Sequence, residues 1–532
     1  MKFFETYVDK IKYFLNKIYI DSYVRKYIAF NKKKWKSYKI RDPKGVILLD
    51  LFDHYPFIYF WSYIANVVAK KHNLEIKYFY FYFYKSRFEK SFLYLRKIKK
   101  IFESFNVTKG IDENDFKNIT FKFKEQLNKK FNKLKNKKKF IEYKYRDILI
   151  GDLIYDTYLR NTFKPTINFD DTHLFDLFIR AHKIFDQIEN FMKVNNVKLV
   201  IPSHPHYIQF GIITRIALKN KIKVFQIFQT NQGNNNLRIR KIFPDFPKER
   251  ERYFEYKKNF FKLKNKRKLK RIGKSILMRR LTGKKDYSLP YIKNNTYSKF
   301  FKNSSVKELE KENKIIIFTH CFFDSPHKHR KMLFEDFYEQ LKFILSLSKY
   351  NKKYNWFIKP HPASFFQNDK ALKEFLLKDY VNVTLLDKDT SNGNIAKSKP
   401  KLIITDHGTI AHEMAYFGIP VLNTGDNPHI NYNFNLHANS RKHIKNILNN
   451  LPHFIKKINF NQNNIFEFVY MHYIFSMNSE NEKKYIKDSF FGKEDSTLNS
   501  QNSILNYLVK NDVKNSKKIC TYIDKFISKN FK

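Results

Sequence analysis

Two parts of the chain alternate short apolar runs with longer amphipathic segments. In the first part, the apolar runs at 46–51 and 197–201 are each followed by a helical pattern. In the second part, runs at 314–319, 356–358 and 402–404 alternate with further helical patterns. Short apolar runs of this kind are typical of parallel strands that are buried on both faces. The alternation in the second part therefore predicts a doubly wound sheet, and the chain as a whole is expected to be an α/β protein with two Rossmann-like domains.

Residues 401–423 form a complete strand, helix and strand unit, KLIITDHGTIAHEMAYFGIPVLN. Thr409 is expected to cap the helix, because its hydroxyl can accept a hydrogen bond from a free amide of the first turn. Gly418 is expected to end the helix. Glu413 lies one turn in, where a carboxylate can accept hydrogen bonds from sugar hydroxyls. The pattern predicts an anion site at the helix start, but an ordinary βαβ turn has the same spacing.

Three polar loops follow apolar runs in the second part, at 320–327, 359–364 and 406–409. The carboxyl ends of parallel strands meet at one edge of a sheet, so these loops are expected to converge on one crevice. The loop 359–364 begins with Lys-Pro-His-Pro. Lys359 supplies a positive charge there, and His361 supplies a hydrogen-bond donor with an ordinary pKa near neutrality.

The pattern Gly408-Thr409, then Glu413, then Gly418-Ile419-Pro420-Val421 resembles the donor-site helix of GT-B glycosyltransferases and of sugar-nucleotide 2-epimerases. The Lys-Pro-His-Pro string resembles a motif of bacterial capsule glycosyltransferases, including those that use CMP-activated acidic sugars. In these families the Gly-Thr or Gly-Ser end holds a nucleotide phosphate and the glutamate holds the ribose. The resemblance implies a GT-B-like fold, with two domains facing a cleft, and six donor-binding residues: His320, Lys359, His407, Gly408, Thr409 and Glu413.

The resemblance has one departure and several catalytic implications. Where teichoic-acid polymerases usually show Tyr-Ser-Ser, this chain has His407-Gly408-Thr409, which counts against glycerophosphate transfer. The expected catalytic residues are His361 and Asp324, with Asp53 as a general-base candidate in the turn after the first apolar run. A solvated turn is the commoner explanation for a residue such as Asp53 at this position.

Acceptor binding is expected in the first domain. Asp152, Asp156 and Arg160 are spaced four apart and would line one helix face, as an acceptor-sugar site or as a structural ladder of ion pairs. His204 and His206 lie in a turn after the apolar run that ends near 201. Without an acidic neighbour they are weak metal ligands, and contacts to an anionic sugar are the better hypothesis.

The net charge of +53 over 532 residues is large, and a nucleic-acid partner is one explanation. Lys, Asn, Ile, Phe and Tyr are abundant together while only 12 residues are Gly, which indicates codon bias instead. The segment Lys262–Lys285 is strongly basic but has no aromatic nucleic-acid module. We therefore expect no nucleic-acid partner, and the basic surface leaves an anionic membrane open as a partner. The basic stretch 86–140 reads as mostly helical.

The sequence predicts a cytoplasmic protein, with peripheral attachment to the inner face of the membrane as an open alternative. The two cysteines, Cys321 and Cys520, form no disulfide framework or metal spacing. Asp387-Lys388-Asp389 has the form of a metal-binding Asp-x-Asp but lacks its context, so it is interpreted as a solvent loop. No cofactor and no metal are expected.

These observations together favour a glycosyltransferase of surface polysaccharide synthesis that moves a sugar from a nucleotide-sugar donor to a saccharide or glycolipid acceptor. A sugar-nucleotide epimerase on the same scaffold is the first alternative, and a non-catalytic basic protein that binds nucleic acid or membrane is the second. The expected segments are a basic helical segment 1–45, an acceptor domain 46–236, a basic interdomain segment 237–312, a nucleotide-sugar domain 313–455 and a helical tail 456–532.

Overall fold

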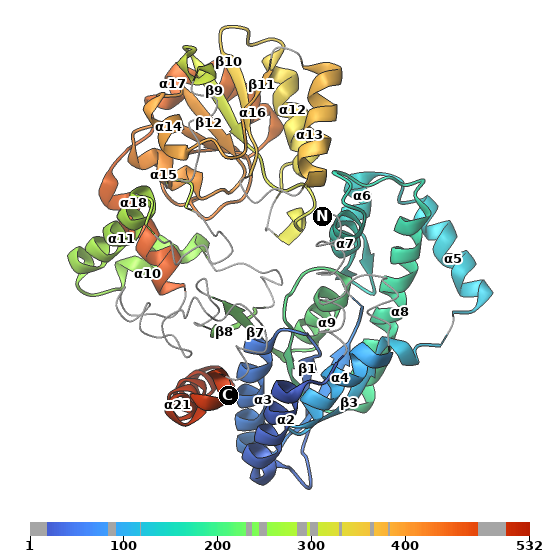
Figure 1. Ribbon diagram of the computed structural model, residues 1–532. Coiled ribbons are helices and arrows are strands. Elements are labelled where there is room, and N and C mark those ends of the chain that lie inside the picture. Colours follow the sequence, from blue (N-terminus) through green and yellow to red (C-terminus); the bar gives the residue numbers. More distant parts are fainter. Residues whose placement is uncertain are drawn as a thin grey trace, which may run out of the picture.

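The apolar runs form strands in two six-stranded sheets, one in each domain of the computed structural model (Figure 1). The expected fold class, two Rossmann-like α/β domains with further helices, is confirmed. The structure describes residues 19–82, 92–117, 119–229, 237–243, 253–284, 295–297, 307–328, 332–361, 366–380, 383–476 and 507–531.

The first sheet has the strand order β3-β2-β1-β6-β7-β8, which is the order 3-2-1-4-5-6 of a Rossmann fold. Its neighbours pair in parallel except β7 and β8, which are antiparallel. The order places the topological switch point between β1 and β6. The strands are β1 (Val46–Asp50), β2 (Glu75–Tyr80), β3 (Val107–Asp112), β6 (Val197–Ile201), β7 (Lys223–Gln229) and β8 (Leu237–Lys241).

The second sheet repeats the same order, β11-β10-β9-β12-β13-β14, and all its neighbours are parallel. Its switch point therefore lies between β9 and β12. The strands are β9 (Lys314–Phe318), β10 (Asn355–Lys359), β11 (Val383–Leu385), β12 (Leu402–Thr405), β13 (Val421–Asn423) and β14 (Leu436–His437).

Helices pack on these sheets and bury the apolar strand residues, as in β1, where every residue is buried. In the first domain they are α2 (Ser22–Trp35), α3 (Tyr55–His72), α4 (Phe92–Glu103), α5 (Phe121–Asn132), α6 (Lys137–Ile141), α7 (Gly151–Thr162), α8 (Thr172–Val194) and α9 (Ile208–Lys219). In the second they are α12 (Phe337–Ser348), α13 (Phe366–Asp379), α14 (Asn392–Lys397), α15 (Ile410–Tyr416), α16 (Arg441–Asn449) and α17 (Leu451–Ile455).

Two sequence expectations for the first domain are corrected. The stretch 86–140 contains the strand β3, which the helical interpretation missed because its middle residues Thr108 and Lys109 are exposed and polar. The expected domain boundary at 236 falls just before β8, which pairs with β7, so the first sheet extends beyond it. Edge strands such as β3 and β8 bury less surface and therefore carry a weaker apolar signal.

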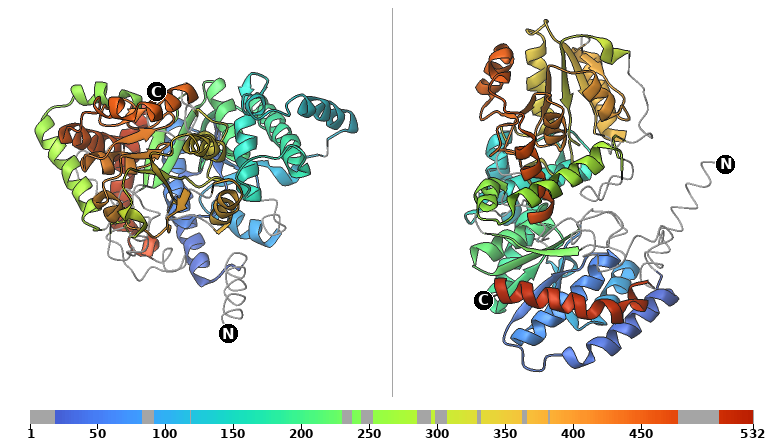
Figure 2. Two further views of the ribbon diagram at one scale, coloured as in Figure 1. Left: turned by 90° about the horizontal axis from the view of Figure 1, so that it is seen from above. Right: turned by 90° about the vertical axis from the view of Figure 1, so that its left-hand side faces the viewer.

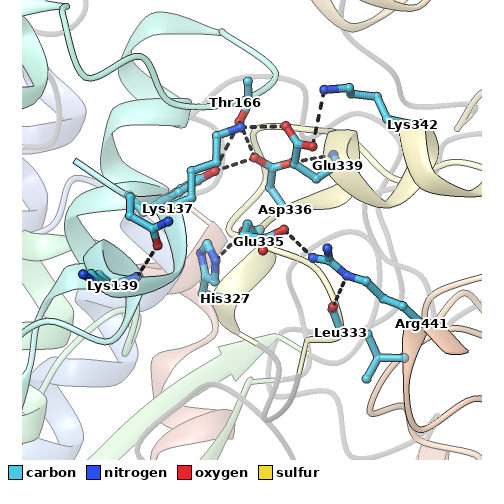
Figure 3. Close-up of polar contacts among 12 residues, drawn as sticks. Lys137, Lys139, Thr166, His327, Leu333, Glu335, Asp336, Glu339, Lys342 and Arg441 are labelled. Carbon is cyan, nitrogen blue, oxygen red and sulfur yellow. Dashed lines mark hydrogen bonds and ion pairs between the residues drawn. The ribbon is translucent and has the colours of Figure 1, made fainter. Parts of the chain in front are cut away.

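The two domains meet through α7 and the start of α12. Asp336 caps α12 by accepting from the Glu339 amide at 2.7 Å. The same carboxylate accepts from the Tyr155 and Thr166 hydroxyls of the first domain, at 2.5 and 2.6 Å. Lys137 donates to Glu339 at 2.7 Å across the same interface (Figure 3). These buried and half-buried polar contacts fix one side of the interface between the domains.

The interdomain segment packs on the second domain through helix α11 (Lys266–Leu281), beside α18 (Gln462–Tyr470) (Figure 1). Gly273 allows this contact, because a Cβ at that position would lie 2.0 Å from the backbone oxygen of Phe466. A short helix α10 (Tyr256–Phe261) precedes α11. The strongly basic run is therefore a packed helix with one buried face.

The C-terminal helix α21 (Asp512–Asn530) returns to the first domain and lies along α3, as the views in Figure 2 show. Its Ile519, Ile523 and Ile527 are buried in the same cluster as the apolar residues of α3. The Asp512 carboxylate also accepts from the Tyr59 hydroxyl at 2.8 Å. The C-terminal helix therefore packs on the first domain, against α3.

Residues 1–18 of the expected basic helical segment 1–45 lie outside the described residues. Among the helices of the described ranges, none is both long and apolar enough to cross a membrane.

Candidate active site

A cavity of about 330 Å³ opens at the switch point of the second sheet, between the ends of β9 and β12. All three polar loops reach it, through His320 after β9, His361 after β10 and His407 after β12. The expected convergence of these loops on one crevice is confirmed for their described residues. The volume is within the range of small-ligand pockets, which begins at about 300 Å³.

A cluster of three rings forms one wall of the pocket. The imidazoles of His320 and His407 are nearly parallel, at 4.1 Å between centroids, and Phe337 packs against both rings, at 4.9 Å from His320 and 5.8 Å from His407. Asp406, which is 2% exposed, lies 2.6 Å from the His407 Nδ1. Because a carboxylate only accepts, Nδ1 carries the proton, and Nε2 is then the basic atom of a neutral ring. Burial lowers the pKa of His320 well below its usual value.

The Lys-Pro-His-Pro loop supplies two further polar groups, Lys359 and His361. Its last residue, Pro362, lies outside the described residues. Burial, and then the charge of Lys359, lower the pKa of His361 to about 4, so its imidazole is neutral at pH 7. Burial also lowers the pKa of Lys359 to about 8. The Lys359 ammonium donates to the Lys388 and Pro360 carbonyls at 2.5 and 3.2 Å, so backbone carbonyls hold the charge that was expected to contact a phosphate.

The donor motif differs from its expectation in two contacts. Thr409 has no capping hydrogen bond to the first turn of α15; instead its hydroxyl accepts from the Arg280 Nη2 at 3.2 Å. Glu413 is completely buried, and its Oε1 accepts from the Arg280 Nε at 2.5 Å. Its Oε2 accepts from the Tyr297 hydroxyl at 2.9 Å. Arg280 lines the pocket and was not singled out from the sequence, because it lies in the strongly basic run 262–285 among many other lysines and arginines.

Asp324 lies at the edge of the pocket that faces the first domain. Its side chain is 54% exposed and is 3.5 Å from the Lys328 ammonium. Lys328 lowers the pKa of Asp324, and His206 and Arg160 of the first domain add to that effect. Asp324 is therefore an ionised, accessible carboxylate between the two domains.

The remaining first-domain residues are arranged differently from the sequence expectation. Asp152 is 1% exposed and bound by both terminal nitrogens of Arg215, at 2.6 and 2.8 Å. A ladder of ion pairs along α7 was one of two alternatives for Asp152, Asp156 and Arg160, and Asp152 has no part in it because it pairs with Arg215 on α9. Asp53 is not among the described residues that line the pocket.

His204 and His206 lie after β6, beyond the carboxyl end of that strand. Their rings contact each other at 5.2 Å between centroids, edge to face. Nearby, the Asp50 carboxylate at the end of β1 accepts from the Ser203 amide at 3.0 Å, and burial raises its pKa to about 7. The switch point of the first sheet therefore has a polar lining of its own.

Metal ligation has no support in the described part of the chain, where no three His, Cys, Asp or Glu side chains are grouped to hold an ion. Asp387 accepts from the Asp389 amide at 2.8 Å, which is a local turn contact.

No protein-family model and no curated protein matches the chain. Several solved structures match parts of the chain at low identity and low TM-score. UDP-GlcNAc 2-epimerase from Neisseria meningitidis is 12% identical over 80% of this chain and 96% of its own, with a TM-score of 0.26. The beta Kdo 2,4 transferase KpsC from Thermosulfurimonas dismutans is 9% identical over 52% and 79%, with a TM-score of 0.30. The beta Kdo 2,7 transferase KpsC from the same organism is 14% identical over 55% and 86%, with a TM-score of 0.29. Scores this low carry no functional argument. The function is therefore argued from the residues of the pocket.

Proposed function

We propose that the protein is a sugar-nucleotide-dependent glycosyltransferase of the GT-B type that acts in surface polysaccharide synthesis. The observation that carries this proposal is the meeting of three strand-end loops in one pocket at the switch point of the second sheet, with Arg280 in its wall. Such crevices are where open α/β sheets bind nucleotides. A cation and several neutral imidazoles suit the phosphates of a nucleotide sugar, with CMP-activated acidic sugars as one donor class.

In this proposal the second domain binds the donor and the first domain presents the acceptor. The bond between the anomeric carbon and the phosphate oxygen breaks, and the acceptor oxygen bonds to that carbon. Hydrogen bonds from His361 and the guanidinium of Arg280 stabilise the negative charge on the departing phosphate. Asp324 is the best-placed group to take the acceptor proton, because it is ionised and faces His206 of the acceptor domain. Asp53 has no place in this scheme, and Asp152 has only a structural role.

The test begins with thermal stabilisation by CMP, UDP, GDP and CDP, since a ligand of the native state raises the melting temperature by mass action. Transfer from the matching nucleotide sugar is then assayed with the His361→Ala variant and with His453→Ala, an exposed histidine on α17, as the matched control. His361→Ala should abolish transfer at an unchanged melting temperature, and His453→Ala should retain it. Full activity of His361→Ala would remove that residue from the site.

An epimerase is the second candidate, and the Asp406–His407 contact favours it. This contact orients a base inside the pocket, and such a base can remove a proton from a bound sugar. An epimerase would convert the nucleotide sugar without any acceptor. Product analysis with the donor alone therefore separates the two activities. Absence of stabilisation by any nucleotide would leave basic binding as the explanation.

A further inference from the structure

We propose that Arg280 is the principal phosphate ligand of the pocket, and that Glu413 is a positioning residue that holds its guanidinium and does not bind ribose. This inference rests on the proposed function only for the identity of the ligand, an anionic nucleotide sugar. It assigns the main positive charge of the site to helix α11, which lies in the interdomain segment and not in either Rossmann-like domain.

The contacts of Arg280 fix its guanidinium plane at the pocket wall. Its Nε donates to the Glu413 Oε1 at 2.5 Å, and its Nη2 donates to the Thr409 hydroxyl at 3.2 Å. Its side chain is 7% exposed, and the residue lines the cavity. A guanidinium has five N–H donors in a planar fork, so two anchored donors orient the rest of the group. That fork matches the oxygens of a phosphate.

Glu413 has no free side toward a ribose. One oxygen accepts from Arg280, and the other accepts from the Tyr297 hydroxyl at 2.9 Å and lies 3.5 Å from the Asn392 amide nitrogen. The side chain is wholly buried and is not part of the pocket lining. A ribose could reach it only after displacing Arg280 or Tyr297. Glu413 therefore lies behind the pocket lining, where it positions Arg280.

The other cation of the pocket is less suited to this role. Lys359 is 1% exposed, and its ammonium already donates to two backbone carbonyls. A buried ion pair such as Arg280 with Glu413 is a poor source of stability, because desolvation offsets much of its attraction. The pair of Arg280 with Glu413 is better explained by ligand binding, because Glu413 holds the Arg280 charge at the pocket wall.

The placement of α11 explains how an interdomain helix reaches the site. Gly273 lets α11 approach the α18 backbone closely, and Arg280 follows two turns later at the C-terminal end of the helix. The Asn295 amide donates to the Arg280 carbonyl at 2.7 Å and secures that end. The position of the guanidinium thus depends on the packing of α11 against α18.

Calorimetric titration at fixed salt tests the assignment, with inorganic pyrophosphate and with the nucleotide that best stabilises the protein. Arg280→Ala should weaken both by about ten- to a hundredfold, because charge-assisted hydrogen bonds are lost. Arg280→Lys should lose less, since the charge remains. Arg271→Ala removes the same charge from an exposed position on the same helix and should change affinity by less than about twofold, because exposed charges are screened.

Pyrophosphate separates a positioning glutamate from a ribose ligand, because it contains no ribose. Glu413→Gln should weaken pyrophosphate and nucleotide binding by a similar factor, about five- to tenfold, because a neutral amide holds the guanidinium less firmly. Thr409→Val, which removes only the other anchor, should weaken both a few fold. Unchanged or tighter pyrophosphate binding in Glu413→Gln, with weaker nucleotide binding, would overturn the inference in favour of ribose contact.

Failure of the inference and failure of the proposed function give different results. If the wild-type protein binds and turns over a nucleotide sugar while Arg280→Ala binds pyrophosphate normally, only the role of Arg280 is wrong. If pyrophosphate binding depends on Arg280 while no nucleotide sugar is bound or converted, the anion site stands and the glycosyltransferase proposal falls. Circular dichroism of each variant checks that it is folded.

Discussion

The Nδ1 of His327 in the second domain lies 2.6 Å from the Asp156 Oδ1 of the first domain. Its Nε2 lies 2.8 Å from the Glu335 carbonyl oxygen. Since a carboxylate and a carbonyl only accept hydrogen bonds, both ring nitrogens donate and the ring is an imidazolium. The side chains of His327 and Asp156 are 4% and 2% exposed. A buried ion pair therefore joins the two domains beside the Asp336 contacts in Figure 3.

Breaking this pair should loosen the domain interface. His327→Ala leaves the Asp156 carboxylate buried without its partner, and the loss of one member of a buried pair typically costs about 3–5 kcal/mol. Urea unfolding should report that loss, and hydrogen exchange should increase in α7. Arg441→Ala is the matched control, because Arg441 pairs with Glu335 close by but is 46% exposed. Its loss should cost less than about 1 kcal/mol. Equal effects in both variants would contradict a special role for the pair.

His182 should make stability depend on pH in the mildly acidic range. Its Nδ1 donates to the Phe178 carbonyl at 2.7 Å, and its Nε2 accepts from the Tyr143 hydroxyl at 2.9 Å, which describes a neutral ring. Burial lowers its pKa to about 4 in the folded protein. Between pH 4 and 6.5 the unfolded chain binds the proton more readily, so stability falls as pH falls.

The expected loss from His182 is about 2 kcal/mol between pH 7 and pH 5. Urea unfolding at both pH values measures it. His182→Gln can keep both hydrogen bonds but cannot titrate, so its stability should change less over the same interval. The same pH dependence in this variant would assign the effect to another group.

Gly273→Ala should destabilise the contact between α11 and α18. The added Cβ would lie 2.0 Å from a backbone oxygen, which a rotamer change cannot relieve. Overpacking of this kind costs about 1–3 kcal/mol. Gly393→Ala on α14 is a suitable control, because its Cβ would meet only side-chain atoms, the Ser391 hydroxyl oxygen at 3.3 Å and a Tyr297 ring carbon at 3.7 Å. Thermal melting should show a clear loss for the first variant and a small change for the second. The first should also weaken pyrophosphate binding, since Arg280 is on the same helix.

The sequence predicted the sheets and the meeting of the loops because both follow from local rules. Apolar runs mark buried strands, and parallel topology brings the residues after β9, β10 and β12 together. These rules alone bring His320, His361 and His407 to one edge of the second sheet.

The partners of those residues could not be predicted, because they come from distant segments. Glu413 is paired with Arg280, 133 positions away, and Asp156 with His327, 171 positions away. Nothing in local spacing distinguishes Arg280, which contacts Glu413 and Thr409, from its exposed neighbours on the same helix. Thr409 was expected to cap its helix for a local reason, and a long-range contact with Arg280 replaced that cap.

Anion binding in the pocket should weaken as pH rises through about 8. In the unliganded protein the lowered pKa of Lys359 is about 8, so its charge is present below that pH and is lost above it. An anion binds the charged form more tightly, and affinity should fall by at most about tenfold per pH unit between pH 8 and 9.5. Two nearby groups do not titrate there. The pKa of His361 is about 4, and burial raises the pKa of the Cys321 thiol to about 12.

Titration with the best-bound nucleotide at pH 7, 8 and 9 measures this dependence, since its phosphates, with a last pKa near 6, keep a constant charge over most of that range. Lys359→Gln should bind more weakly than the wild type at pH 7 and show a flat profile. His361→Gln should bind more weakly but keep the wild-type slope, because its imidazole is neutral throughout. An unchanged slope in Lys359→Gln would mean that another group titrates. A flat wild-type profile would mean that carbonyl-bound Lys359 does not contribute to the field in the pocket, and Arg280 alone would then supply the charge.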